Sequence, residues 1–127
     1  MGLFGDKIKI EKEHFNGCFT LEKHEVANFR ERHGFKVTIE NKNGNIFIEA
    51  RKSRLLKSYV ITNIYSQTGL VDCSISFIDF DKNEIMNFIK SNFKQKDWYY
   101  ELPNGNKLHE STQNGQPNNY LYFKITR

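Results

Sequence analysis

The chain has 127 residues, 38% of them hydrophobic and 14% aromatic, and a formal net charge of +4. This composition excludes a disordered chain, and the length indicates one domain or two small halves that share a core. The modest charge does not by itself indicate a polyanionic partner. No apolar run approaches the roughly 20 residues that a membrane-spanning helix needs, and the first residues lack the pattern of a secretion signal.

The first predicted elements are a short strand over 14–19 and a helix that follows Thr20. Thr20 is a suitable N-cap, and the positive end of the helix dipole favours the glutamates in the first turns. Gly34 marks the end of the helix. The side chains that recur at helical spacing are Val26, Phe29 and His33.

Asn43-Gly44 predicts a tight hairpin between strands 35–41 and 45–52, because both residues tolerate the positive φ of such a turn. One face of this hairpin is expected to be core and the other to be solvated. The predicted core-face pairs are Asn41 with Ile46, Ile39 with Ile48, and Val37 with Ala50.

Residues 55–65 and 71–77 are predicted to form two further strands joined by a turn over 66–69. A four-residue loop pairs Ile64 with Val71, Thr62 with Cys73 and Val60 with Ile75. This register gathers four side chains on the core face of the second strand, namely Val71, Cys73, Ile75 and Phe77.

A second helix is predicted to begin at Asp81, which has the character of an N-cap residue. Three strands follow over 97–102, 107–111 and 120–126, with a polar loop over 112–119. The helix carries the clearest amphipathic pattern in the chain, formed by Ile85, Phe88, Ile89 and Phe93.

The elements repeat in the order strand, helix and three strands, and residue identities recur at a spacing of 61. We therefore predict one α+β domain over 1–127, with two βαβββ pseudo-repeats at about 8–66 and 70–127. They form a curved mixed or antiparallel sheet with one helix on the outer side of each half. Convergence is the alternative, because any tight hairpin favours Asn-Gly. The residues that recur are Glu40, Asn43, Gly44, Asn45, Glu49, Tyr59 and Ile64.

Two segments resemble the vicinal oxygen chelate superfamily of glyoxalases, bleomycin-resistance proteins and extradiol dioxygenases. The segment 28–37 is similar to its helix end and Gly-Phe-x-Val strand, and 103–108 is similar to its Asp-Pro-Asp-Gly-Asn-x-Ile turn. The resemblance implies a two-module fold and a metal-dependent enzyme. The family's metal site needs His or Glu on the first and last strands of each module, and these strands offer only His14 here. The resemblance therefore implies the ligand-holding use of the fold.

Neither the histidines nor the cysteines have the spacing of a catalytic or metal site. The histidines His14, His24, His33 and His109 lack ligand spacing, so we predict no catalytic residue, metal or cofactor. Because no secretion signal is present, we expect Cys18 and Cys73 to be reduced and buried, and the protein to be cytoplasmic.

Aromatic residues cluster in the last third of the chain, where tyrosine and tryptophan are typical of binding surfaces. The second hairpin also carries Lys107 and His109 where the first has Ile46 and Ile48, so it loses part of its core face. The alternative is that the rings fill a cleft or cover the second helix. The predicted binding residues are Trp98, Tyr100, Lys107, His109, Tyr120 and Tyr122.

A basic run over 51–57 is the most charged stretch, and it supports a second hypothesis of phosphate contact. A solvated loop is its alternative interpretation. The residues of this nucleic-acid hypothesis are Arg51, Lys52, Arg54 and Lys57.

The sequence thus predicts a small soluble non-catalytic binding protein that holds a small molecule or a protein on its sheet or cleft surface. Ligand sequestration and inhibition or immunity are the expected roles. The alternatives are an accessory protein that binds nucleic acid and a metal-dependent enzyme of the family resembled. We expect no membrane partner and either a monomer or a homodimer.

Overall fold

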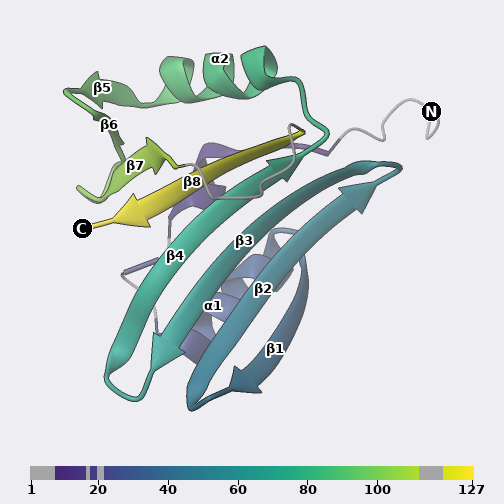
Figure 1. Cartoon of the computed structure of the whole chain (residues 1–127), viewed down its shortest axis with the longest axis vertical. Helices are drawn as coiled ribbons and strands as arrows, with labels where there is room; N and C mark the ends of the chain where they lie inside the picture. Colours follow the sequence, from purple (N-terminus) through teal and green to yellow (C-terminus); the bar gives the residue numbers. More distant parts are fainter. Residues whose placement is uncertain (1–7, 17, 20–21, 112–118) are drawn as a thin grey trace.

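A computed structural model describes residues 8–16, 18–19, 22–111 and 119–127, which form one sheet and two α-helices (Figure 1). The α+β class is therefore confirmed. The elements in chain order are η1 (Lys12–Phe15), α1 (Lys23–Arg32), β1 (Lys36–Lys42), β2 (Asn45–Arg54), β3 (Lys57–Ser66), β4 (Gly69–Ile78), α2 (Lys82–Asn92), β5 (Lys94–Lys96), β6 (Tyr99–Glu101), β7 (Lys107–Glu110) and β8 (Tyr120–Thr126).

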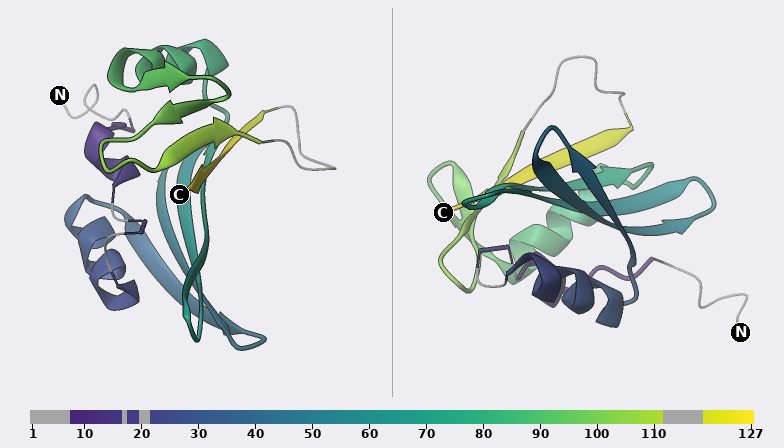
Figure 2. Two further views of the ribbon diagram at one scale, coloured as in Figure 1. Left: turned by 90° about the vertical axis from the view of Figure 1, so that its left-hand side faces the viewer. Right: turned by 90° about the horizontal axis from the view of Figure 1, so that it is seen from below.

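The eight strands lie in the order β1-β2-β3-β4-β8-β7-β6-β5, and every neighbouring pair is antiparallel. Of the two predicted sheet types, the antiparallel one is therefore observed. The sheet is bent, and both helices lie on one of its faces (Figure 2). The short helix η1 lies on the same face, between α1 and α2.

The main core lies between the sheet and this helical layer. Phe15 of η1 is fully buried, with its ring centroid 6.0 Å from Phe88 and 5.2 Å from Phe93. Burial of such aromatic rings removes a large apolar area from water. The amphipathic pattern of the second helix is thus confirmed, with Ile85 and Ile89 at 1% and 0% exposure.

The register of the first hairpin is confirmed at all three predicted pairs. Its core face is only partly as predicted, because Ile48 and Ala50 are buried whereas Ile39 is 61% exposed. Ile39 lies on β1, the outermost strand, where fewer neighbours cover a side chain. The hydrophobic pattern thus gave the face correctly but not the depth of burial.

The predicted register between the third and fourth strands is wrong beyond the turn. The turn closes with Ser66 opposite Gly69, but β4 carries one extra residue, Val71, between the pairs Tyr65–Leu70 and Ile64–Asp72. A β-bulge of this kind shifts every later pair by one residue. As a result, Ile61 rather than Val60 faces Ile75, Asn63 rather than Thr62 faces Cys73, and Val71 is 56% exposed.

The predicted first strand is also wrong, since residues 12–15 form a 3-10 helix. Two further predictions, the Thr20 cap and most of the loop over 112–119, fall outside the described residues. In the second half, the sheet gains the short strand β5 before the predicted ones. The division into two pseudo-repeats stays a prediction.

Asp81 caps α2 as predicted, since its Oδ1 atom accepts a hydrogen bond from the backbone N–H of Asn83 at 2.9 Å. We expect Asp81→Ala to lower the free energy of unfolding by about 1 kcal/mol, because an N-terminal backbone donor of the helix loses its partner. Urea denaturation followed by circular dichroism measures this change. Asp81→Asn is the matched control and retains most of the stability. Equal losses in both variants would show that the carboxylate charge acts on the helix dipole instead.

Candidate functional site

The structure brings three of the predicted binding residues together on the helix-free face of the sheet. Trp98 lies in the two-residue turn between β5 and β6, with its ring centroid 5.1 Å from that of His109 on β7. The Nζ atom of Lys107 lies 5.8 Å from the Trp98 ring and 5.2 Å from the Tyr99 ring, within reach of a cation–π interaction. We call Trp98, Tyr99, Lys107 and His109 the Trp98 surface.

Tyr99 joins this surface in place of the predicted Tyr100. Successive residues of a strand point to opposite faces, so Tyr99 faces outward while Tyr100 is buried opposite Leu108. Tyr122 is also buried, with 8% of its surface exposed. Tyr120 is 37% exposed but pairs with Ile78 at the opposite end of β8 from Ile125, which pairs with Leu108 of β7. These three tyrosines are therefore not part of the Trp98 surface.

The expected loss of core face in the second hairpin is wrong. A three-residue turn over 103–105 joins β6 to β7, closed by a hydrogen bond from Leu102 N–H to Asn106 O of 2.9 Å. The Asn43-Gly44 turn has only two residues between Lys42 and Asn45. The extra residue reverses the facing of the strand that follows, so fully buried Leu108 is the core residue and Lys107 and His109 face outward.

The basic run over 51–57 does not form one surface. Arg51 and Lys52 are adjacent on β2 and point to opposite faces. The Nη2 atom of Arg51 lies 3.4 Å from Glu49 Oε1, whereas Lys52 Nζ lies 4.8 Å from the Phe35 ring on the helical side. Partial burial lowers the pKa of Lys52. Only Arg54 and Lys57, which face each other beside the β2–β3 turn, share one place.

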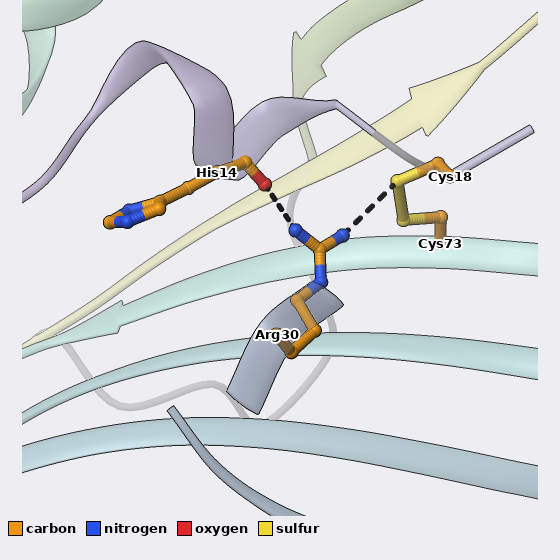
Figure 3. Close-up of a disulfide and its surroundings, with 4 residues drawn as sticks. All are labelled: His14, Cys18, Arg30 and Cys73. Carbon is orange, nitrogen blue, oxygen red and sulfur yellow. Dashed lines mark hydrogen bonds between the residues drawn. A yellow bond between two sulfur atoms is a disulfide. The ribbon is translucent and has the colours of Figure 1, made fainter. Parts of the chain in front are cut away.

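A buried polar cluster that the sequence did not reveal lies under α1 (Figure 3). The Arg30 side chain is 1% exposed, and its Nη1 atom donates a hydrogen bond of 2.6 Å to the carbonyl oxygen of His14. Its Nη2 atom lies 3.8 Å from the Sγ atom of Cys18. Burial lowers the pKa of Arg30 to about 10. Arg30 therefore connects α1 to the segment that carries η1.

Cys18 and Cys73 form a disulfide between this segment and β4, with Cα atoms 6.4 Å apart. Both cysteines are buried as predicted, but the prediction that they are reduced is wrong. The two positions are 55 residues apart in the sequence, so no local spacing indicated the pairing. The bond and Arg30 together fasten the segment across the helical face of the sheet.

His14 is the second polar member of this cluster and is 1% exposed. Its Nδ1 atom lies 3.2 Å from the backbone nitrogen of Glu11 and 3.2 Å from the hydroxyl oxygen of Tyr59. Because the Glu11 N–H donates to Nδ1, the ring is held with Nδ1 as an acceptor. Burial, and then the positive charge of Lys52, lower the pKa of His14 to about 3. Burial raises the pKa of Tyr59.

A pocket of about 340 Å³ lies between the start of α1 and the β3–β4 turn. It contains none of the predicted binding residues. Its walls combine apolar groups, hydroxyls and both signs of charge, so it suits a small polar molecule. The lining residues that define it are Cys18, Phe19, Lys23, Tyr65, Thr68 and Arg127.

Among the described residues, one group of three potential metal ligands has its donor atoms within 4.8 Å of one another, formed by Glu22, His24 and Glu25. All three side chains are exposed at the start of α1, where acidic groups commonly occur without a metal. This is not the arrangement on strands that the family resemblance implies. In the described part of the chain, no helix is long and apolar enough to cross a membrane.

The comparisons with known proteins identify no relative of this chain. No protein-family model, no curated protein and no solved structure matches it.

Proposed function

We propose that the protein is a non-catalytic binding protein that holds a partner protein on the Trp98 surface. The observation that carries this proposal is the exposure of Trp98, 58% of whose surface faces solvent although its ring contacts Tyr99 and His109. Tryptophan is the residue most enriched among the anchors of protein interfaces, where burial against a partner recovers its large apolar area.

The neighbours of Trp98 support a role as an anchor. Ring contacts with Tyr99 and His109 restrict its side chain before a partner arrives, which reduces the entropy lost on binding. Lys107 places a positive charge over the rings, and this charge favours a partner with an acidic group beside an apolar one. The surface is exposed rather than enclosed, which suits a protein better than a small molecule.

Replacing Trp98 tests this proposal. We expect Trp98→Ala to weaken binding of the partner by roughly 30-fold, the loss typical of a central aromatic anchor. The partner is first captured from the source cells on immobilised wild-type protein, and its affinity is then measured for purified variants. Trp98 is the only tryptophan, so a shift of its fluorescence emission on binding reports directly on this surface.

Val71→Ala is the matched control, because Val71 is similarly exposed at 56% but lies on the β4 bulge. Its affinity stays within a factor of about two of wild type, as for surface changes outside an interface. A partner that binds Trp98→Ala as tightly as wild type, with no shift in Trp98 emission, would contradict the proposal.

A small-molecule ligand is the second candidate, and the pocket beside Tyr65 supports it. Its volume of about 340 Å³ lies at the lower end of the range for ligand sites. Native mass spectrometry of the protein purified from its source tests for such a ligand. The nucleic-acid hypothesis and the metal-dependent enzyme of the family resembled stay predictions, and no further observation favours either.

A further inference from the structure

The strand β1 forms one edge of the sheet, and no described strand pairs with its outer side (Figure 1). In the described part of the chain it pairs only with β2. Six of its seven side chains are exposed, and the strand contains neither a proline nor a bulge. Regular edge strands of this kind can pair with another strand through their free backbone groups.

The sequence of β1 is complementary to itself about Thr38. When two copies align antiparallel with Thr38 opposite Thr38, Lys36 of each faces Glu40 of the other. In the same register Val37 faces Ile39 on the other side of the strand. Opposite charges, apolar pairs and threonine pairs are the cross-strand contacts that stabilise antiparallel strands.

We propose that the protein forms a symmetric homodimer in which two β1 strands pair about Thr38 and join the two sheets into one. The partner is thus a second copy of this chain. A two-fold axis through the Thr38 pair makes every contact occur twice, as in an isologous interface.

Charge disfavours the neighbouring register about Ile39. Alignment about Ile39 places Lys36 opposite Lys42, a like-charge pair that destabilises a sheet. Within one chain, Lys36 lies opposite Arg51 of β2, and their positive charges repel each other. The Glu40 carboxylate of the second copy reduces this repulsion. The Oε2 atom of Glu40 lies 3.1 Å from Lys42 Nζ, and the second carboxylate oxygen can contact a second lysine.

The proposal also accounts for Ile39, which is 61% exposed on the helical side of the sheet. In the dimer it packs against Val37 of the second copy. The other edge strand, β5, lacks this complementarity, because pairing about Gln95 brings Lys94 opposite Lys96.

Sedimentation equilibrium and charge exchange test the dimer. We expect the average mass of wild type to rise with concentration from 15.0 kDa toward twice that value. Lys36→Glu or Glu40→Lys alone weakens the dimer by roughly tenfold, because each places two like-charge pairs in the interface. The double variant Lys36→Glu/Glu40→Lys restores it, and this rescue distinguishes the interface from a folding defect.

A cysteine at the axis tests the register. Both native cysteines are in the disulfide, so Thr38→Cys adds a single free thiol, and mild oxidation yields a covalent dimer. Lys42→Cys is the matched control, because in this register the two thiols lie roughly 27 Å apart and do not cross-link.

A monomer up to about 1 mM, or cross-linking of Lys42→Cys as efficient as that of Thr38→Cys, overturns the proposal. The Trp98 surface is formed by the strands β5–β7, at the edge of the sheet opposite to β1. Either proposal can therefore fail without the other.

Discussion

We expect replacement of both Cys18 and Cys73 by alanine to lower the free energy of unfolding by about 4 kcal/mol. A cross-link between residues 55 apart removes conformational entropy from the unfolded chain, and the variant regains this entropy when it unfolds. The effect is large because the bond holds the segment with η1 against β4, far away in the sequence. Urea denaturation at neutral pH measures this change. The free energies of wild type and variant are extrapolated with the same dependence on urea concentration (m-value).

Reduced wild-type protein is the control for this variant, because it keeps both sulfur atoms and loses only the bond. We expect it to unfold close to the alanine variant. Titration of free thiols in the unfolded, unreduced protein finds none from Cys18 and Cys73. An unfolding midpoint that does not change on reduction would contradict the assignment of a stabilising cross-link.

Acidification below pH 6.5 destabilises the protein through His14. Its pKa is about 3 in the folded chain and about 6.5 in the unfolded chain, so the unfolded state binds the extra proton first. Above pH 6.5 the ring is neutral in both states and has no effect. As the pH falls from 6.5 toward 3, stability is lost, and the loss amounts to about 2.7 kcal/mol at pH 4.5.

His14→Asn isolates this effect, because the amide oxygen can accept the hydrogen bonds from Glu11 N–H and the Tyr59 hydroxyl while the side chain does not titrate. Urea denaturation at several pH values between 7 and 4.5 gives the slope for each protein. The variant should retain only the slope due to carboxylates. Parallel pH profiles for the two proteins would show that His14 protonates equally in both states.

Local features of the fold were predictable, and features that depend on one added residue were not. The Asn43-Gly44 turn determines the register of its hairpin directly, because the chemistry of both turn residues is visible in the sequence. The Val71 bulge adds one residue within β4, and the three-residue turn over 103–105 adds one to the connection between β6 and β7. A single added residue reverses which side chains face the core, and no hydrophobic pattern reports it reliably.

The candidate site shows the same division. Trp98, Lys107 and His109 could be predicted as a group because aromatic and charged side chains close in sequence come together on the consecutive strands β5, β6 and β7. Arg30 could not, since an arginine on a helix is ordinarily solvent-facing. Its burial depends on a carbonyl group of the segment around His14, which arrives from a different part of the chain.

The strand order has a consequence for synthesis of the protein. In the described part of the chain, β8 is the last strand; it pairs with β4 in the middle of the sheet and with β7 on its other side. While the ribosome is still making residues 120–126, β1–β4 can already pair through local hairpins, but β5–β7 lack the strand that pairs them with β4. Until β8 is made, the backbone groups of β4 that pair with β8 stay exposed at the edge of the partial sheet. The centre of the sheet therefore stays open to aggregation until β8 is made.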